Sequence, residues 1–312
     1  MNRIAKQRGL TLVELMVAMV LGLFLMLGAM SVYTQGRQQY QSAGVVARLQ
    51  ENARFAFDVL ETDIRLAGFW GRYNIGANSN ALGVAVVCGA NNVTAWALDT
   101  TNPVQATNNV PIDSNGNVVP NCSAFGDGVI PNTDVLVVRH ASGQPQALTN
   151  GRVQIQSDLG KAQTFSDGVL PVGFVATEST THDAVVNAWY LSAGSNTLND
   201  VPSLRRRTLI NTTMVDEEVI AGVENMQIQF GVDTDNDGSI ERFVDPDNGV
   251  VAGNQVLSVR VWLLMRSEYT ERGFTDGKTY VLPDAVLADF VPNDNFRRMQ
   301  SSKTIMLRNI RG

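Results

Sequence analysis

An uncharged, apolar run near the N-terminus constrains this chain more than any other feature. The 22 residues from Leu15 to Gly36 carry no formal charge. At about 1.5 Å per helical residue they span roughly 33 Å, enough to cross one bilayer. Glu14 stands at the entrance of this run, and a carboxylate at the centre of a membrane costs about 2.5 to 3.5 kcal/mol on insertion scales. The run therefore predicts a transmembrane helix in which Glu14 needs a cation or an interfacial position.

A short basic leader precedes this run. It contains Arg3, Lys6 and Arg8 and no acid, and positive charge on this side predicts a cytoplasmic N-terminus. The alternative is an ordinary secretory signal peptide, with Leu15–Gly28 as its apolar region and Ala29-Met30-Ser31 as its cleavage site. Because the run exceeds the ~7–15 residues of such a region and an acid at its entrance is unfavourable, we favour a retained helix.

An amphipathic stretch follows the apolar run. Between residues 46 and 67 apolar residues recur at steps of three or four, and charged residues occupy the other face. Since no proline or loop-forming cluster separates the two stretches, they predict one helix of roughly 55 residues. The apolar positions are Val46, Leu49, Ala53, Phe57, Leu60, Ile64 and Ala67, and the charged ones are Arg48, Glu51, Arg54, Asp58, Glu61, Asp63 and Arg65.

The leader meets the helix at Gly9-Leu10-Thr11-Leu12-Val13-Glu14-Leu15. This junction resembles the class III signal of type IV prepilins. The resemblance implies that a prepilin peptidase cuts after Gly9 and that the new N-terminus, Leu10, is methylated. It also implies a partner for Glu14, the positive N-terminal amine of an adjacent subunit in the filament. Removing one member of such a buried pair leaves the other charge without a partner and destabilises the assembly by about 3 to 5 kcal/mol. Glu14 is therefore expected to act in subunit assembly.

Four further segments make the resemblance specific to one family of pilins. They read DIRLAGFWG at 63–71, VENMQIQFGVDTDNDG at 223–238, VLSVRVWLLMRS at 256–267 and FRRMQSSKTIMLRNIR at 296–311. Together they resemble PilW-type minor pilins of bacterial type IV pili. The resemblance implies an α+β, pilin-like fold, in which a long N-terminal helix with a transmembrane half and an amphipathic half packs on an antiparallel β-sheet head. The implied divisions are a leader at 1–9, the helix at 10–70 and a periplasmic, β-rich head at 71–312.

The head begins with an unusual composition and continues with strand-like runs. Residues 77–131 are rich in Asn, Gly, Thr, Ser, Val and Pro, which predicts a loop-rich insertion with short strands. In two of the later runs apolar and polar residues alternate, so we expect residues 225–232 and 256–264 to be antiparallel neighbours packed against the amphipathic helix. The runs are Thr133–His140, Arg152–Gln156, Val185–Leu191, Leu204–Ile210, Asn225–Val232 and Val256–Leu264.

The chain has two cysteines, Cys88 and Cys122, and both follow the membrane segment. A translocated chain meets an oxidising compartment, so we expect a disulfide that closes the insertion and contributes about 2–4 kcal/mol. Two unpaired buried thiols are the alternative.

The segment DTDNDGSIE at residues 233–241 predicts a cation site. Its acids alternate as at positions 1, 3 and 5 of an EF-hand loop, and a hard cation such as calcium takes oxygen ligands at this spacing. Position 12 of such a loop is Val244, so Asp245 or Asp247 would have to supply the missing acid. The alternative is an acidic turn that joins two strands. The candidate ligands are Asp233, Asp235, Asp237, Ser239, Glu241, Asp245 and Asp247.

Charge and motif content argue against nucleic-acid binding and catalysis. The formal charge of −6 becomes −9 without the three leader cations, and nucleic-acid affinity depends on phosphate neutralisation. The basic cluster Arg205-Arg206-Arg207 is interpreted as a strand with a solvated face. His140, on a predicted strand, and His182, in a predicted loop, have no partner at a spacing typical of a catalytic or zinc site, so we expect no enzyme activity.

Three functions are compatible with the sequence. The first is a minor pilin that joins other minor pilins and the major pilin in a tip or priming complex, contacts a tip adhesin, and promotes pilus assembly and thereby adhesion and motility. The second is a minor pseudopilin of a type II secretion system, and the third a membrane-tethered binding protein. The first implies an inner-membrane protein with a periplasmic head, which later moves to the pilus tip.

Overall fold

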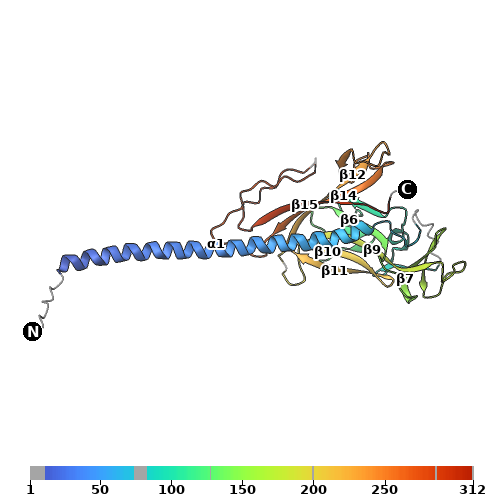
Figure 1. The fold of residues 1–312 in the computed structure, drawn as a ribbon, viewed down its shortest axis with the longest axis horizontal. Coiled ribbons are helices and arrows are strands. Elements are labelled where there is room, and N and C mark those ends of the chain that lie inside the picture. The colour runs from blue at the N-terminus through green and yellow to red at the C-terminus, as the bar shows by residue number, and fades with distance from the viewer. Residues whose placement is uncertain (1–10, 74–82, 127, 199, 285–286, 311–312) are drawn as a thin grey trace, which may run out of the picture. The chain divides into compact units, whose positions relative to one another are not determined.

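The computed structural model describes residues 11–73, 83–126, 128–198, 200–284 and 287–310. The chain divides into two compact units, residues 1–48 and residues 49–312. A single helix, α1 (Leu12–Leu66), is 55 residues long and confirms the predicted length and continuity. A β-rich head follows it (Figure 1), so the predicted fold class is confirmed.

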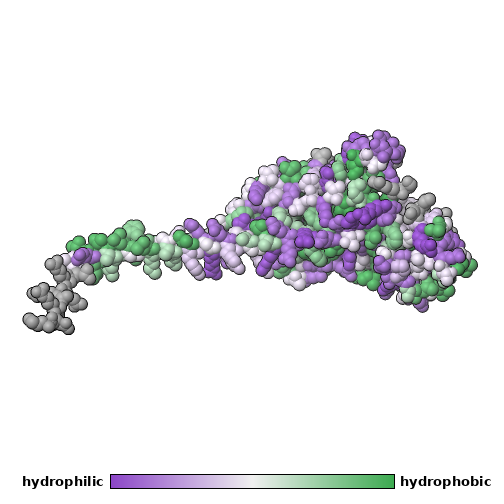
Figure 2. All heavy atoms as spheres, in the orientation of Figure 1, coloured by the Kyte–Doolittle hydropathy of each residue, from purple (hydrophilic) through white to green (hydrophobic). Residues whose placement is uncertain are grey.

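The first unit consists of the N-terminal part of α1. Its large apolar side chains are exposed from Leu12 to Tyr33, and Figure 2 shows them as a green stretch of the helix. By length and composition this helix can cross a membrane. The exposed surface is thus of the kind that lipid or other apolar helices cover.

In the second unit α1 buries one face. The buried side chains Leu49, Ala53, Phe57, Leu60 and Ile64 are at most 7% exposed, and their spacing of three or four residues confirms the predicted apolar face. The helix is followed by Gly68, whose φ of +74° lies in the left-handed region that glycine adopts at helix ends. Asp63 departs from the prediction, because it is only 7% exposed although its charge placed it on the polar face.

In the described residues, the larger sheet of the head has nine strands. Its main path runs β2-β1-β11-β10-β9-β6-β3, and a hairpin of β7 and β8 joins it at β9. Four of the predicted runs, at 133–140, 152–156, 185–191 and 204–210, are strands of this sheet. The strands are β1 (Val87–Cys88), β2 (Asn91–Asn92), β3 (Val104–Thr107), β6 (Val135–Ala141), β7 (Asn150–Ser157), β8 (Ala162–Asp167), β9 (Thr180–Ser192), β10 (Ser203–Ile210) and β11 (Thr213–Ala221).

The smaller sheet has the strand order β13-β12-β14-β15. As predicted, its two central strands are antiparallel neighbours, with Ile228 opposite Val261 in the register. The alternating apolar side chains of both strands are buried. The strands are β12 (Val223–Asp233), β13 (Arg242–Val244), β14 (Gln255–Arg266) and β15 (Arg298–Met306).

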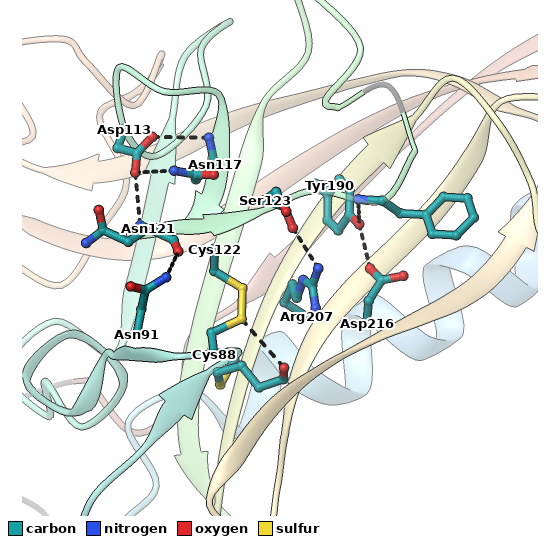
Figure 3. Close-up of a disulfide and its surroundings, with 12 residues drawn as sticks. Cys88, Asn91, Asp113, Asn117, Asn121, Cys122, Ser123, Tyr190, Arg207 and Asp216 are labelled. Atoms are coloured by element: carbon teal, nitrogen blue, oxygen red, sulfur yellow. Dashed lines mark hydrogen bonds between the residues drawn. A yellow bond between two sulfur atoms is a disulfide. The ribbon is translucent and has the colours of Figure 1, made fainter.

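The insertion after the helix contains only short elements, as its composition predicts. In its described residues they are α2 (Thr94–Ala97), β4 (Asn117–Val119) and β5 (Cys122–Ser123), together with the short strands β1, β2 and β3 of the larger sheet. Because the elements are short, side chains hold much of this region. Asp113 accepts hydrogen bonds from Asn117 Nδ2 at 2.7 Å and from the backbone N of Asn121 at 3.1 Å (Figure 3).

A buried carboxylate joins the two sheets. Asp134 precedes β6 and is fully buried. Its Oδ2 accepts a hydrogen bond from Ile228 N of β12 at 2.6 Å, and its Oδ1 accepts one from Asn109 N at 2.8 Å. Burial raises the pKa of Asp134 to about 7, although both backbone N–H groups favour its charged form.

A long connection links β14 to β15. Isolated bridges pair Asp276 with Asp294 and Tyr280 with Phe290, so the connection folds back on itself as a narrow ribbon. Arg298, at the start of β15, fixes its base through ion pairs with Glu224 and Asp294. The ribbon is therefore tied to the smaller sheet rather than free in solvent.

Candidate functional sites

The N-terminus of the described helix carries a capping box. Thr11 Oγ1 accepts a hydrogen bond from Glu14 N at 3.3 Å, and Glu14 Oε2 accepts one from Thr11 N at 3.1 Å. This reciprocal pair satisfies N–H groups that have no partner within the helix. Glu14, for which the resemblance implies a partner on another subunit, thus also has a partner on its own chain. The predicted processing residues Gly9 and Leu10 lie outside the described residues.

Four carboxylates converge in the loop between β12 and β13. Asp233, Asp235, Asp237 and Glu241 each offer one oxygen, and these oxygens lie within 4.8 Å of one another. Asp233 ends β12 and is buried, whereas the other three side chains are exposed. Oxygen ligands arranged in this way are those that calcium takes in proteins.

The loop curves around Asp233, whose carboxylate accepts hydrogen bonds from backbone N–H groups of the loop. Its Oδ1 accepts a hydrogen bond from Asn236 N at 2.7 Å, and its Oδ2 accepts one from Gly238 N at 2.8 Å. Gly238 has a φ of +86°, a conformation that favours glycine. Burial opposes ionisation of Asp233, but the N–H groups of Gly238 and Asn236 outweigh it and lower the pKa. Asp233 is therefore held as a carboxylate anion.

The other three predicted ligands, Ser239, Asp245 and Asp247, are not part of this group of four carboxylates. Ser239 lies in the loop, and its N–H donates to Asp237 Oδ1 at 2.7 Å. Asp245 and Asp247 lie outside the carboxylate group that the described residues form, and Asp247 Oδ1 instead accepts a hydrogen bond from Asn108 Nδ2 at 3.0 Å. After Glu241 the chain forms β13, which runs antiparallel to β12 and leads away from the loop. Asp245 and Asp247 follow β13 and therefore lie apart from the four carboxylates.

A disulfide joins Cys88 and Cys122 and confirms the predicted bridge. It connects β1 to β5, with a sequence separation of 34 and 5.8 Å between the two Cα atoms. Figure 3 shows how hydrogen bonds flank it, from Asn91 Nδ2 to Asn121 O at 2.6 Å and from Arg207 Nη2 to Ser123 O at 2.6 Å. The bridge therefore belongs to the structural framework of the insertion.

The basic cluster on β10 is only partly exposed to solvent. Arg205 has a side chain only 2% exposed and forms ion pairs with Asp216 and Glu218 of β11, and Arg206 pairs with Glu217. The predicted solvated face is therefore wrong for Arg205. The opposing strand neutralises the cluster, which leaves little positive charge there for a phosphate ligand.

Both histidines are buried in strands. His140 lies on β6 as predicted, but His182 lies on β9 and is 4% exposed, so its predicted loop position is wrong. His182 Nδ1 lies 2.7 Å from Ser142 O and its Nε2 lies 3.2 Å from Thr180 Oγ1. These local contacts give His182 a structural role.

Asp63 is a polar centre that the sequence pattern did not identify. It is buried on the apolar face of α1, where Oδ1 accepts from Asn187 Nδ2 at 2.8 Å and Oδ2 accepts from Trp189 Nε1 at 2.6 Å. The sequence did indicate that Asp63 is buried, because it lies three positions after Leu60 and four before Ala67 and so shares their face of the helix. The site ties α1 to β9.

Comparison with known proteins gives two family matches. The family model described as Type IV Pilus-assembly protein W matches residues 188–309, and the one described as Prokaryotic N-terminal methylation motif matches residues 4–30. Among solved structures, the chain is similar to a type IV-like pilin from Thermus thermophilus, with 12% sequence identity and a TM-score of 0.38, over 85% of this chain and 99% of that one. None of the curated proteins matches this chain.

Proposed function

We propose that the chain is a PilW-type minor pilin, in line with its two family matches, and that it joins a tip or priming complex of a type IV pilus and promotes assembly. The observation that carries this proposal is the methylation motif at residues 4–30, which overlaps the start of an uninterrupted 55-residue helix. A helix with an exposed apolar first part can be held by a bilayer and then by other helices of a filament.

In this proposal the N-terminal residues act in sequence. A prepilin peptidase cleaves after Gly9, Leu10 becomes the methylated N-terminus, and Glu14 pairs with the N-terminal amine of a neighbouring subunit. The head resides in the periplasm while the helix is in the inner membrane, and it reaches the pilus tip with the assembled complex. Other minor pilins, the major pilin and a tip adhesin are the proposed partners, and adhesion and motility follow from the pilus. The pilin families are structural, and we assign no catalytic role.

The proposal is tested first by the mass of the N-terminal peptide of the protein extracted from its native membranes. A peptide that begins at Leu10 with one added methyl group is expected. A peptide that begins near Val32 or at Met1 would contradict processing at Gly9. Loss of surface pili on deletion of the gene tests the assembly role, and unchanged pili with lost type II secretion would assign the chain to a pseudopilus instead.

The acidic loop supports a second role, the binding of calcium by the head. Asp233, Asp235, Asp237 and Glu241 supply oxygens close enough for one cation, and ionised carboxylates at this spacing repel one another without one. The proposed role is structural, since a bound cation would brace the turn between β12 and β13. Calorimetric titration of the full chain in detergent with calcium chloride tests it, and an absence of heat at millimolar calcium would contradict it.

A further inference from the structure

Strand β15 leaves a long edge of the smaller sheet without a partner strand. It is nine residues long and ends the order β13-β12-β14-β15. Within the described parts of the chain, the edge strands β2, β3, β13 and β8 are shorter, at two, four, three and six residues. The nine-residue β11 is paired by β1 at Thr213 alone. A short edge strand is itself a protection against pairing with other chains, and β15 lacks that protection.

The register shows which backbone groups of β15 face outward. Leu307 N donates to Leu257 O, and Ser267 N donates to Arg297 O, at the two ends of the β14–β15 ladder. The ladder between them has no register shift, and in an antiparallel pair alternate residues bond the partner strand. The odd-numbered residues of β15 therefore bond β14. The N–H and C=O groups of Gln300, Ser302 and Thr304 point away from it.

A groove lies beside this edge, between β15 and α1. It has a volume of about 450 Å³ and is lined on the helix by residues that include Ala53 and Phe57 and on the strand by Met299, Ser301 and Ser302. Ala53 and Phe57 are almost fully buried and form an apolar floor on the helix side. Polar and charged side chains complete the lining, namely Gln50, Arg54, Asp58 and Lys303. The small side chains of Ser301 and Ser302 leave room along the strand.

Among the residues that the structure describes, the ribbon between β14 and β15 contacts only the first part of β15, where Tyr280 Oη donates to Arg298 O and Gln300 Nε2 donates to Val281 O. Three other devices that block a sheet edge are missing from β15. The strand contains no proline, and its pairing contains no bulge. Its one lysine, Lys303, forms an ion pair with Glu61 of α1, with 2.5 Å between the ammonium nitrogen and the carboxylate oxygen. Its charge is therefore not placed at the open edge of the strand. Natural edge strands that avoid pairing generally carry a proline, a bulge or a free charge.

We propose that β15 is a docking edge for an extended strand of another pilus subunit, which adds to the smaller sheet and fills the groove beside α1. Free backbone donors and acceptors recognise an extended strand through main-chain hydrogen bonds, and a groove for alternate side chains adds specificity. The partner strand places small apolar side chains toward Ala53 and Phe57 and polar ones toward solvent. This inference rests on the proposed function, because it takes the partner from the pilus.

A proline at an outward-facing position tests this edge. Ser302→Pro removes one outward N–H without breaking the ladder to β14, because proline is tolerated on the open side of an edge strand. Ser302→Ala keeps that N–H and is the matched control. Each full-length variant is expressed in the native host in place of the wild type, and its amount in sheared pili is compared with its amount in membranes. We expect about a tenfold lower share in pili for Ser302→Pro and a wild-type share for Ser302→Ala.

Amide hydrogen exchange of the wild-type chain gives a second test that needs no folded variant. Peptides covering residues 298–307 should exchange more slowly in pili than in the detergent-extracted subunit. Equal exchange, or a wild-type share of Ser302→Pro in pili, would overturn the docking edge while leaving the pilus role intact. Absence of the wild-type chain from pili and from every minor-pilin complex would instead overturn the proposed function. A disulfide-linked homodimer of Ser302→Cys would assign the edge to a second copy and overturn the proposed partner.

Discussion

His140 Nε2 on β6 lies 2.9 Å from Asp63 Oδ1 on α1, and both side chains are buried. The other ring nitrogen of His140, Nδ1, lies 2.7 Å from Ala141 O. The ring thus lies between two oxygen atoms, and its contact with Asp63 attaches the helix to the larger sheet.

We predict that Asp63→Ala lowers the free energy of unfolding by about 3–5 kcal/mol, because it leaves His140 and two further buried donors without their acceptor. The measurement is urea unfolding of the full chain in detergent, followed by the fluorescence of Trp189, whose indole contacts Asp63. Asp58→Ala is the control, since its side chain is 59% exposed, and it should change stability by less than about 0.5 kcal/mol. Equal stability of the two variants would contradict the role of Asp63.

Asp134 predicts a pH dependence of stability. Its folded-state pKa is raised to about 7, against about 3.9 in an unfolded chain. Between these values the folded state keeps a proton that the unfolded state has released, so this group lowers the free energy of unfolding as pH rises from 4 to 7. Above pH 7 its effect is constant. The total effect is at most about 4 kcal/mol.

Asp134→Asn should remove this dependence. The neighbouring carboxyl groups Asp284 and Asp245 contribute to the raised pKa of Asp134, but they are present in both proteins. The stability of the variant relative to the wild type should therefore rise between pH 4 and 7 and level off above it. Unfolding curves at five pH values measure this difference, and parallel pH profiles of the two proteins would contradict the prediction.

The acidic loop predicts a calcium-dependent stability. A ligand present at 100 times its dissociation constant stabilises the folded state by about 2.7 kcal/mol, so calcium should raise the melting temperature of the wild type. The double variant Asp235→Asn, Asp237→Asn should lose this shift. Asp247→Asn should keep it, because Asp247 lies outside the carboxylate group. The same shift in all three proteins would show that calcium acts elsewhere.

The disulfide predicts a redox-dependent stability of the head. It closes a sequence separation of 34 residues, so the double variant Cys88→Ser, Cys122→Ser should lose about 2–4 kcal/mol. Wild type treated with a reductant should unfold like this variant, and the variant should not respond to the reductant. A reductant effect of equal size on the variant would assign the change to something other than the bridge.

The periodicity of apolar residues was enough to predict most of the fold. Leu60 and Ile64 on the helix and Ile228 on β12 mark buried faces that depend only on local spacing. The burial of Arg205 was missed, because it depends on acids of the next strand. A sequence signal for it exists: Arg205, Arg206 and Arg207 face Glu218, Glu217 and Asp216 across the turn at Asn211.

The candidate sites were predicted less completely than the fold. The alternating acids 233, 235 and 237 predicted the loop site because ligand spacing within a turn is a local property. Asp245 and Asp247 were misplaced because the pairing of β13 with β12 decides where they lie. The contacts of Asp63 could not be predicted, since its partners His140 and Trp189 follow it by 77 and 126 residues.

Variants of Glu14 can separate helix capping from the proposed charge pairing between subunits. Glu14→Ala removes both the capping contacts with Thr11 and the negative charge. Glu14→Gln keeps a side chain that can complete a capping box but carries no charge. We predict that both variants are cleaved after Gly9. Both should be less abundant in sheared pili, because an unpaired amine on a neighbouring subunit would destabilise the filament by about 3–5 kcal/mol. Quantitative mass spectrometry of membranes and pili measures both steps. Wild-type incorporation of Glu14→Gln would show that capping, not charge, is what assembly requires of this residue.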